Sequence, residues 1–414
     1  MTTYRWIVAQ IGAREHYAVA RAFHRRGQLA ALYTEAWCRW GSRLLQNAPN
    51  PLRGLAGRFQ PELRSANVVS FTLGTLLEET WRACRRPKST QESFRRHTDI
   101  GRAFALRVNH HLRGMKIDPA SHAYFGYNTG CLETLEILRN QGVTTVVDQI
   151  DPGRTEEELV FQESQKWPGW QVMPGRIPDF YYDRLAREWE LASVVLVNSA
   201  WSKSALVQQG VPERQIVVVP LAYEPVGDTT PKQHQPRTGG TGPLVVLWLG
   251  SVILRKGIQY LLQAARLLKD HPIEIIVAGP IGIAKSVVAG APKNVRFVGR
   301  VDRDRAADFY RAADVFVLPT ISDGFATTQL EAMSHGLPVI ATPNCGEVVT
   351  HEQDGLIVPA YDAAALARAI ARLDADRPLL LEMSRCASHK CKQFSLQHYA
   401  EQVEAAAEEC RQQS

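Results

Sequence analysis

The sequence has little of what membrane-spanning, secreted or zinc-bound proteins need. Its apolar runs are only as long as strands, so we expect no transmembrane helix. A strand pattern starts within a few residues of Met1, where a signal peptide would show a charged and then an apolar stretch. The seven cysteines are an odd number, and none of them forms a CxxC pair. These absences argue against a disulfide framework and predict a cytoplasmic protein.

Metal-binding patterns are also scarce. Cys386, His389 and Cys391 lie close together, but no second group of ligands accompanies them, which favours a structural or surface role. The triplet Asp302-Arg303-Asp304 resembles a metal-binding acidic motif, yet it stands where a helix is expected to begin, and helix capping explains it. We therefore predict no metal ion and no cofactor.

Negative charge is sparse near the N-terminus. The first 100 residues hold 16 lysines and arginines against 7 aspartates and glutamates, in a chain of net charge +6. Two segments, 37–66 and 81–97, have no strand periodicity, and the first mixes aromatic and basic side chains: Trp37, Arg39, Trp40, Arg43 and Arg53. They suit an anionic membrane surface, such as the inner face of the plasma membrane, or an anionic acceptor; alternatively they form solvated helices. We find no nucleic-acid-binding module and expect no nucleic acid partner.

What is present is a regular alternation of strand-like and helix-like segments, which predicts parallel sheets with crossover helices. The first series of predicted strands is 4–10, 67–71, 122–127, 144–150, 194–199 and 215–221. The second series is 244–249, 273–278, 295–298, 315–318, 338–341 and 356–358. Between them lies a stretch rich in proline, glycine, threonine and glutamine, which is typical of a linker.

The chain is therefore predicted to be an α/β protein with two doubly wound domains facing a central cleft. The predicted parts are a first domain at 1–224, a linker at 225–242, a second domain at 243–394 and a closing helix at 395–414 that would pack back on the first domain. Ligands of such sheets lie beyond the carboxyl ends of the strands. The loops at those ends hold the candidate site.

The loop after the predicted strand 315–318 is the most informative. A strand that turns through Asp323-Gly324 into a helix gathers free backbone N–H groups and a positive dipole end, which suits phosphate. Asp323 and Glu331 bracket the turn, and their carboxylates suit sugar hydroxyls. Together these groups suggest a nucleotide-sugar. Taken singly, Asp323-Gly324 also fits an ordinary turn, and Glu331 has capping-box spacing from Thr328.

Two further loops of the second series fit the same ligand. The loop that begins at Gly250-Ser251 carries Arg255 and Lys256 at a helix start, where cations are disfavoured unless an anion is bound. A diphosphate therefore explains them better than a solvated pair does. Gly299 and Arg300 follow the strand 295–298 and suit either a nucleobase edge or an ordinary turn.

With these motifs, the second half resembles the donor domain of retaining glycosyltransferases of family 4, which have the GT-B fold. Their pattern is a Glu, Gly-Phe-Gly, a second Glu eight positions after the first, Ala-Met and Gly-x-Pro-Val. The corresponding residues here are Asp323, Gly324-Phe325-Ala326, Glu331-Ala332-Met333 and Gly336-Leu337-Pro338-Val339. The resemblance covers residues 183–375 well and the first 180 only weakly.

The resemblance implies two Rossmann-like domains and transfer of a sugar from a nucleotide-sugar to an acceptor hydroxyl, in glycan, polysaccharide or glycolipid synthesis. The acceptor would be a glycan, a lipid-linked or a small molecule bound by the first domain. The implied catalytic residues are Asp323, Lys256 and Arg255. The implied donor-binding residues are Gly250, Ser251, Lys256, Gly299, Arg300, Asp323, Gly324, Phe325, Ala326, Thr327, Thr328 and Glu331.

Three departures from the family pattern touch the sugar-diphosphate end. Asp323 is one methylene shorter than the usual Glu, and Ala326 replaces a glycine. Ser251 stands where the family usually has an arginine, for which Arg255 is a substitute. Two alternatives stay open, of which the second is suggested by these departures. One is a nucleotide-sugar epimerase of the same fold, although its Ser-Gly-Gly turn is missing here. The other is a nucleotide-sugar-binding protein that has lost catalysis.

The first domain offers an acceptor side. Gly12, Arg14 and His16 lie in the first strand-to-helix loop, and Asn128 and Asp148 follow two later strands, so all are expected to face the cleft. His16 is a candidate acid or base, or a surface histidine at a helix start. Family members often carry a histidine in one of the later loops. None stands there in this chain, so we assign no catalytic histidine.

Overall fold

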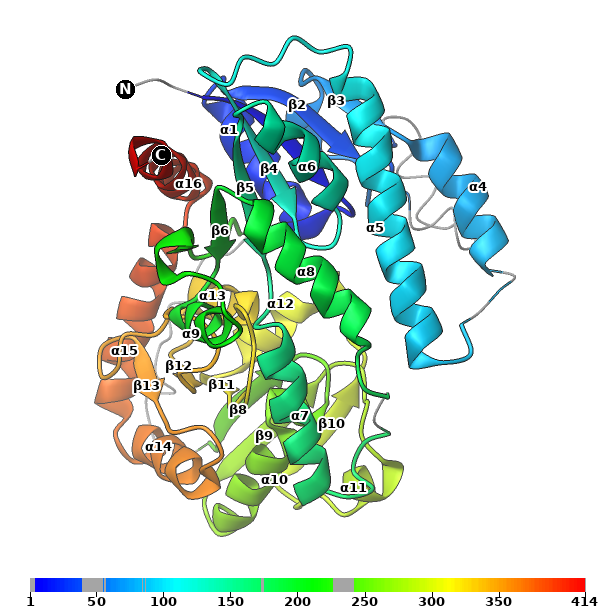
Figure 1. Cartoon of the computed structure of the whole chain (residues 1–414). Helices are drawn as coiled ribbons and strands as arrows, with labels where there is room; N and C mark the ends of the chain where they lie inside the picture. The colour runs from blue at the N-terminus through cyan, green and yellow to red at the C-terminus, as the bar shows by residue number, and fades with distance from the viewer. Residues whose placement is uncertain are drawn as a thin grey trace.

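The structure is a computed structural model that describes residues 4–38, 55, 57–83, 85, 87–172, 175–225 and 242–413 (Figure 1). Most of the predicted linker lies outside these residues, as do Arg39, Trp40, Arg43 and Arg53 of the first basic segment. Within the described ranges, no helix has both the length and the apolar character needed to cross a bilayer.

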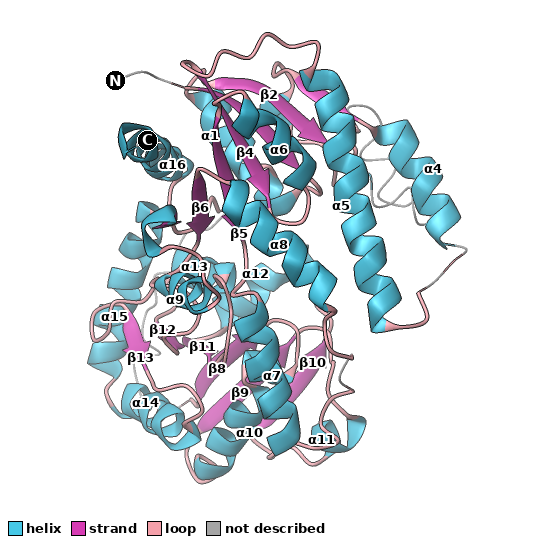
Figure 2. Ribbon diagram, in the orientation of Figure 1, coloured by secondary structure: helices cyan, strands magenta, loops and turns pink. Residues whose placement is uncertain are grey.

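The first sheet has seven parallel strands in the order β3-β2-β1-β4-β5-β6-β7. Their bounds are β1 Arg5–Gln10, β2 Leu29–Thr34, β3 Val68–Ser70, β4 His122–Tyr127, β5 Thr144–Gln149, β6 Val194–Val197 and β7 Ile216–Val218. Every position of β4 and β5 is buried, because helices cover both faces of the sheet (Figure 2).

The helices of this half include α7, which no pattern in the sequence predicted. The elements are η1 Arg14–His16, α1 Ala18–Arg25, η2 Pro61–Leu63, α4 Thr72–Ala83, α5 Thr90–Leu112, α6 Leu132–Asn140, α7 Arg154–Lys166, α8 Asp179–Leu191, α9 Ala200–Gln208 and η3 Glu213–Gln215. The described part of segment 81–97 is thus the end of α4 and the start of α5, as its helical alternative predicted.

The second sheet has six parallel strands in the order β10-β9-β8-β11-β12-β13. They are β8 Leu244–Leu249, β9 Ile273–Ala278, β10 Val295–Gly299, β11 Val315–Leu318, β12 Val339–Ala341 and β13 Gly355–Ile357. Its helices are η4 Leu254–Lys256, α10 Ile258–Leu267, α11 Lys285–Ala289, α12 Arg303–Ala312, α13 Thr327–Ser334, α14 Ala363–Ala375, α15 Arg377–Lys390 and η5 Cys391–Gln393. α12 begins where expected, but the Asp302 side chain makes no capping hydrogen bond, so capping does not explain that residue.

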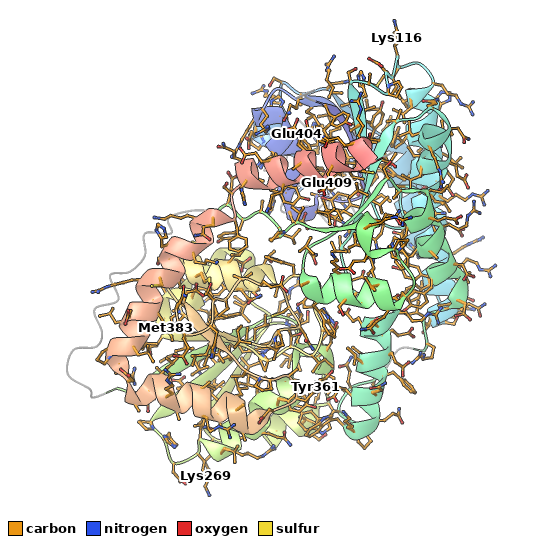
Figure 3. The ribbon with its side chains drawn as sticks, turned by 60° about the vertical axis from the view of Figure 1, so that its left-hand side comes forward. Lys116, Lys269, Tyr361, Met383, Glu404 and Glu409 are labelled. Atoms are coloured by element: carbon orange, nitrogen blue, oxygen red, sulfur yellow. The ribbon has the colours of Figure 1, made fainter. Side chains whose placement is uncertain are left out.

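The last helix, α16 (Leu396–Gln413), leaves the second half and packs on the first sheet. Tyr399 and Val403 share a core with Trp6 of β1. Glu404, which Figure 3 shows on this helix, lies 2.8 Å from a guanidinium nitrogen of Arg26. The chain thus returns to the first half at α16.

α7 makes the opposite crossing. It follows β5 of the first sheet but lies beside α10 of the second half (Figure 1). Glu163 of α7 is 1% exposed, and its Oε2 accepts hydrogen bonds from the hydroxyl of Tyr260 at 2.7 Å and from Gln259. Lys166 lies over the ring of Tyr361, a residue that Figure 3 labels. Part of the span predicted as the first domain therefore packs on the second.

Candidate active site between the two sheets

Each sheet has a topological switch point, and the predicted site loops lie at both. The strand order reverses between β1 and β4 in the first sheet and between β8 and β11 in the second. Doubly wound sheets bind ligands beyond the carboxyl ends of such strands. The loops after β8 and β11 carry Lys256 and Asp323, and the loop after β1 carries Arg14 and His16.

The loops after β8 and β11 are bonded to each other and form one unit, here called the cradle (residues 254–257 and 319–323). The hydroxyl of Thr320 and the N–H of Ile321 both donate to the carbonyl of Arg255, each at 3.0 Å. Gly257 has a φ of 75°, and a Cβ on it would lie 1.7 Å from the carbonyl oxygen of Pro319. Only glycine fits this approach, which fixes the spacing of the two loops.

The carboxylate of Asp323 contacts both cations of the cradle. It forms an ion pair with Nζ of Lys256, and its Oδ1 lies 3.5 Å from Nη1 of Arg255. The side chains of Lys256 and Asp323 are only 16% and 13% exposed, so this pair is little screened by water. The charge of Lys256 is therefore shared with Asp323, and an anion bound at Lys256 competes with that carboxylate.

Glu331 lies on α13 and does not cap it. The helix begins after Ala326 with no side-chain cap, and Oε2 of Glu331 accepts a hydrogen bond from the hydroxyl of Tyr310 at 2.8 Å. The capping-box alternative is therefore wrong. The ring of Tyr310 is buried and stacks on the ring of His335. The hydrogen bond from this fixed ring therefore holds the carboxylate of Glu331 in place.

Glu156 of α7 connects the first half of the chain to the cradle. Its Oε2 accepts a hydrogen bond from the hydroxyl of Ser322 at 3.0 Å and lies 3.3 Å from Nη1 of Arg255. Burial raises the pKa of Glu156 to about 7, although the charge of Arg255 acts in the opposite direction. Arg255 thus has carboxylates on two sides, and its charge is only partly available to an anion.

The two halves touch at the cradle. A Cβ on Gly324 would lie 2.1 Å from the carbonyl oxygen of Ile150, which also accepts a hydrogen bond from Nδ2 of Asn198. Nε1 of Trp201 donates to the hydroxyl of Ser322 at 3.2 Å. The turn that begins the α13 loop is therefore pressed against the carboxyl ends of β5 and β6.

A cavity of about 660 Å³ lies between the sheets, next to this contact. Phe325, Thr327 and Glu331 line it from the second half, and Arg14 and His16 line it from the first. Residues predicted to bind a donor and residues predicted to bind an acceptor therefore face the same space.

The loop after β1 has an unusual backbone. Glu15, His16 and Tyr17 are consecutive and all left-handed, with φ of 44°, 53° and 60°. Such conformations cost non-glycine residues about 1–2 kcal/mol each. The hydroxyl of Tyr127 donates to Glu15 at 3.4 Å, and burial raises the pKa of that carboxyl. A strained loop at a switch point is the kind of place where binding residues are found.

Comparison with known proteins gives a family match within the second half. Residues 243–376 match the family described as Glycosyl transferases group 1. This match includes the loops after β8 and β11, which carry Lys256 and Asp323. The chain is 32% identical over 153 residues to a D-inositol 3-phosphate glycosyltransferase of Streptomyces bingchenggensis, covering 34% of each protein. It is 38% identical over 125 residues to the lipopolysaccharide core biosynthesis mannosyltransferase LpsB of Rhizobium meliloti, covering 29% of this chain and 35% of LpsB. The matches thus span about a third of these relatives.

Solved structures match nearly the whole chain. Anabaena HepE in complex with UDP has a TM-score of 0.61 at 15% identity, covering 98% of this chain and all of HepE. Sucrose-phosphate synthase of Thermosynechococcus elongatus has a TM-score of 0.63 at 20% identity, covering 99% of this chain and all of the synthase. The predicted GT-B fold, with two doubly wound sheets, is confirmed.

Of the twelve predicted donor residues, those that line the central cavity are Phe325, Thr327 and Glu331. The other nine, with Lys256 and Asp323 of the cradle among them, do not line it. Gly299 ends β10, which is an edge strand of the sheet, and Arg300 follows it with an exposed side chain. Ser251 is exposed where the β8 loop begins. Among the residues that the structure describes, none of these three lines the central cavity. Their roles stay predictions.

On the acceptor side, Asp148 lies elsewhere than expected. It is fully buried, and neither carboxylate oxygen has a hydrogen-bond partner among the described residues. Burial, with the nearby charge of Glu15, raises its pKa well above the usual range. It therefore does not face an acceptor in this structure. Asn128 lines a second cavity, which it shares with Arg14, and the N–H of Gly12 donates to Glu35.

Three residues of the site were not predicted: Glu156, Asn198 and Tyr310. Asn198 follows β6, so the rule that selected the other strand ends applies to it too. Glu156 and Tyr310 lie on helices and reach the site only through tertiary packing, which no local pattern indicates. Finally, the described residues contain no cluster of three or more histidines, cysteines or carboxylates suited to a metal ion.

Proposed function

We propose that the protein is a retaining glycosyltransferase that moves a sugar from a nucleotide-sugar to an acceptor hydroxyl. The observation that carries the proposal is the central cavity, where Glu331 and Thr327 of the second half face Arg14 and His16 of the first half. A transferase must hold two substrates against each other, and a cavity between two switch points suits this. The relatives named as an inositol phosphate glycosyltransferase and a mannosyltransferase support the same class.

The proposed donor is a nucleoside diphosphate sugar. Structures of the similar HepE contain UDP and UDP-glucose, so UDP-sugars are the first to test. In this chain Glu331 would accept hydrogen bonds from the ribose hydroxyls and Lys256 would hold the diphosphate. The backbone from Phe325 to Thr328 would contact sugar and phosphate, and Gly299 and Arg300 would lie near the base.

In the proposed reaction, the bond between the anomeric carbon and the diphosphate oxygen breaks, and the acceptor oxygen bonds to the same carbon. The leaving phosphate takes the acceptor proton, so the reaction needs no protein base. Lys256, helped by Arg255 and the helix N-terminus at Thr327, would stabilise the charge that develops on the diphosphate. Asp323, displaced from Lys256, would contact the donor sugar. Because these groups supply the positive field, we propose that transfer needs no metal ion, which an assay in EDTA checks.

We further propose that the product belongs to glycan, polysaccharide or glycolipid synthesis on the cytoplasmic side of a membrane. The excess of positive charge in residues 1–100 supports attachment to anionic lipid. Flotation with phosphatidylglycerol liposomes tests this. Neutralising Arg39, Arg43 and Arg53 together should reduce the bound fraction, and unchanged flotation would contradict the attachment.

The function is tested by a panel of nucleotide-sugars, measured for thermal stabilisation and for sugar transfer. Lys256→Ala should lower kcat/KM by roughly 10²–10³-fold, the usual loss when one transition-state cation or donor is removed. Lys269→Ala, which changes an exposed lysine labelled in Figure 3, should leave kcat/KM unchanged. A donor that binds but never loses its sugar would favour the binding-protein alternative. Interconversion of the donor sugar would favour the epimerase.

A further inference from the structure

The turn after β4 holds a residue in a conformation that its side chain disfavours. Thr129 has a φ of 69°, and a β-branched residue rarely adopts this left-handed region. The preceding residue, Asn128, is 4% exposed and lines the cavity of about 270 Å³ in the first half. Its Oδ1 has no hydrogen-bond partner among the described residues. Backbone strain and an unsatisfied buried oxygen thus stand in adjacent residues at the switch point of the first sheet, and both are features of binding sites.

Two side chains of α8 hold both backbone polar groups of Thr129. Oε2 of Glu188 accepts its N–H at 2.6 Å, and Nε of Arg184 donates to its carbonyl at 3.0 Å. Glu188 and Arg184 are one helical turn apart and are 0% and 9% exposed. Hydrogen bonds to charged groups are strong in such dry surroundings. The pair therefore fixes the peptide units on both sides of the strained residue.

The same carboxylate also holds the start of α6. Oε1 of Glu188 accepts the N–H groups of Leu132 at 3.1 Å and Cys131 at 3.4 Å. A negative charge at a helix N-terminus is favoured by the helix dipole. Arg184 is balanced in turn by Glu133 of α6, whose two oxygens lie 2.9 and 2.8 Å from its guanidinium nitrogens. Glu188 thus joins the strained turn to the helix that follows it.

α5 lies against the other side of the turn. α5, α6 and α8 pack together on one face of the first sheet (Figure 1). A Cβ on Gly101 of α5 would lie 2.0 Å from the carbonyl oxygen of Thr129, and Nε2 of His97 lies 3.4 Å from its hydroxyl oxygen. The turn is therefore held between α5 and α8, and its position sets that of Asn128.

From these contacts we infer that Glu188 is a positioning residue for the acceptor: it holds Thr129 left-handed, so that Oδ1 of Asn128 accepts a hydrogen bond from an acceptor hydroxyl. Asn128 touches the acceptor, whereas Glu188 acts only through the backbone. Arg14 lines both this cavity and the central one, so the two spaces are neighbours. The assignment of the ligand as an acceptor rests on the proposed function; the hold on the turn does not.

The hold depends on the charge of Glu188. Burial raises the pKa of this carboxyl to about 7, although the charge of Arg184 and the three N–H groups act in the opposite direction. Protonation makes the carboxyl a weaker acceptor, so the turn is held more firmly at pH 8 than at pH 6.

Other groups around Glu188 do not share this titration. Those that face it or the turn are Arg184 and Tyr181 of α8, Cys131 and Glu133 at the start of α6, Tyr124 of β4 and His97 of α5. Burial raises the pKa of the tyrosines and the cysteine and lowers that of the histidine. The bonds between the arginine and Glu133 outweigh burial and move the pKa of each away from 7.

The experiment measures UDP release from saturating UDP-glucose by the full chain, with and without methyl α-D-mannopyranoside as the acceptor probe. The ratio of transfer to hydrolysis is the readout, because water needs no contact with Asn128. Glu188→Gln should lower this ratio about tenfold, the loss expected for one misplaced hydrogen bond, and leave hydrolysis unchanged. The wild-type ratio should fall about fivefold from pH 8 to pH 6, as the charged fraction of Glu188 falls from roughly nine tenths to one tenth. In Glu188→Gln it should be flat.

Thr129→Gly tests whether Glu188 acts through strain. Glycine adopts this φ freely and needs no hold, so adding Glu188→Gln to Thr129→Gly should cost about threefold instead of tenfold. A merely structural role would give equal losses in both backgrounds. Glu190→Gln makes the same change at an exposed position of α8 and is the matched control, which should leave the ratio unchanged.

Hydrogen exchange of the amides of Thr129 and Leu132 checks the hold without any sugar transfer. Exchange should be faster in Glu188→Gln and unchanged in Glu190→Gln. Unchanged exchange in Glu188→Gln, or equal losses of transfer and hydrolysis, would overturn the inference. A wild-type chain that hydrolyses UDP-glucose but transfers nothing to the glycoside would contradict the acceptor role of Asn128. A chain with neither activity would sink the proposed function, while the exchange pattern would still stand or fall by itself.

Discussion

The cradle after β8 and β11 and the loop after β1 occupy equivalent places in their sheets, but different forces hold them. In the cradle, charges and hydrogen bonds act between the two loops themselves, as between Lys256 and Asp323. The loop after β1 instead holds Glu15, His16 and Tyr17 in left-handed conformations. That strain must be offset by packing elsewhere: Tyr17 is 1% exposed and meets the ring of Trp37 edge-on at 5.3 Å.

This difference predicts how substitutions in the cradle and in the loop after β1 should differ in their effects. The cradle is specified by short motifs and is held mainly by bonds between its own two loops, so a substitution there should change chemistry more than stability. The loop after β1 depends on side chains from several elements, so a substitution around it should change both. Three predictions test this division, in order of decreasing effect.

The largest effect is expected where the two halves touch. Gly324→Ala places a Cβ against the carbonyl of Ile150, and the halves must then move apart. Because a displacement of about 1 Å can cost roughly 100-fold in rate, we expect a loss of that order in kcat/KM. Donor binding, measured by thermal shift, should change little, since the proposed donor residues lie in the second half alone.

Gly114→Ala is the control, because a Cβ there lies 3.6 Å from its nearest neighbour, the carbonyl of His111. If Gly324→Ala lost donor binding and transfer together, the cradle would not be held mainly by its own two loops. If it lost neither, the contact with Ile150 would have no role in the reaction.

A smaller effect is expected within the second half. Glu331→Gln should raise the KM for the donor about tenfold, since a charged acceptor of hydrogen bonds becomes neutral. Tyr310→Phe removes only the hydrogen bond behind the carboxylate and should cost about threefold. Affinities for UDP and 2′-deoxy-UDP provide the measurement. The preference for the ribose hydroxyl should shrink in Glu331→Gln, and an unchanged preference would show that this carboxylate does not bind ribose.

The same division, between local motifs and distant packing, explains which features could be predicted from the sequence. The bounds of β11 were predicted as they stand, and the turn at Asp323-Gly324 lies where the motif indicated, because a strand, a turn and a helix start are local features. β2, with its alanines, was missed: its weak strand propensity is overridden by pairing with β1 and β3 on either side.

The limit of prediction from sequence is clearer for helix α7. α7 has little apolar periodicity, and it is anchored on the second half by the buried carboxylate of Glu163, which a hydrophobic pattern cannot reveal. With α7 unplaced, neither its crossing nor the contact of Glu156 with the cradle was predictable. Residues that reach the site through distant packing had to come from the structure.

The smallest effect concerns Glu156, the one carboxylate of α7 that acts on the cradle from outside. Its pKa of about 7 means that the carboxyl is largely neutral at pH 6 and charged at pH 8. Above pH 7 it therefore pairs with Arg255 and repels a diphosphate. The KM for a UDP-sugar, whose diphosphate does not titrate in this range, should accordingly rise about threefold from pH 6 to pH 8.

Glu156→Gln should hold the low KM at both pH values. Glu157→Gln changes the neighbouring carboxylate, which accepts a hydrogen bond from Tyr182, and should keep the wild-type pH profile. A pH dependence that survives Glu156→Gln would assign the titration to another group and leave the cradle independent of the first half.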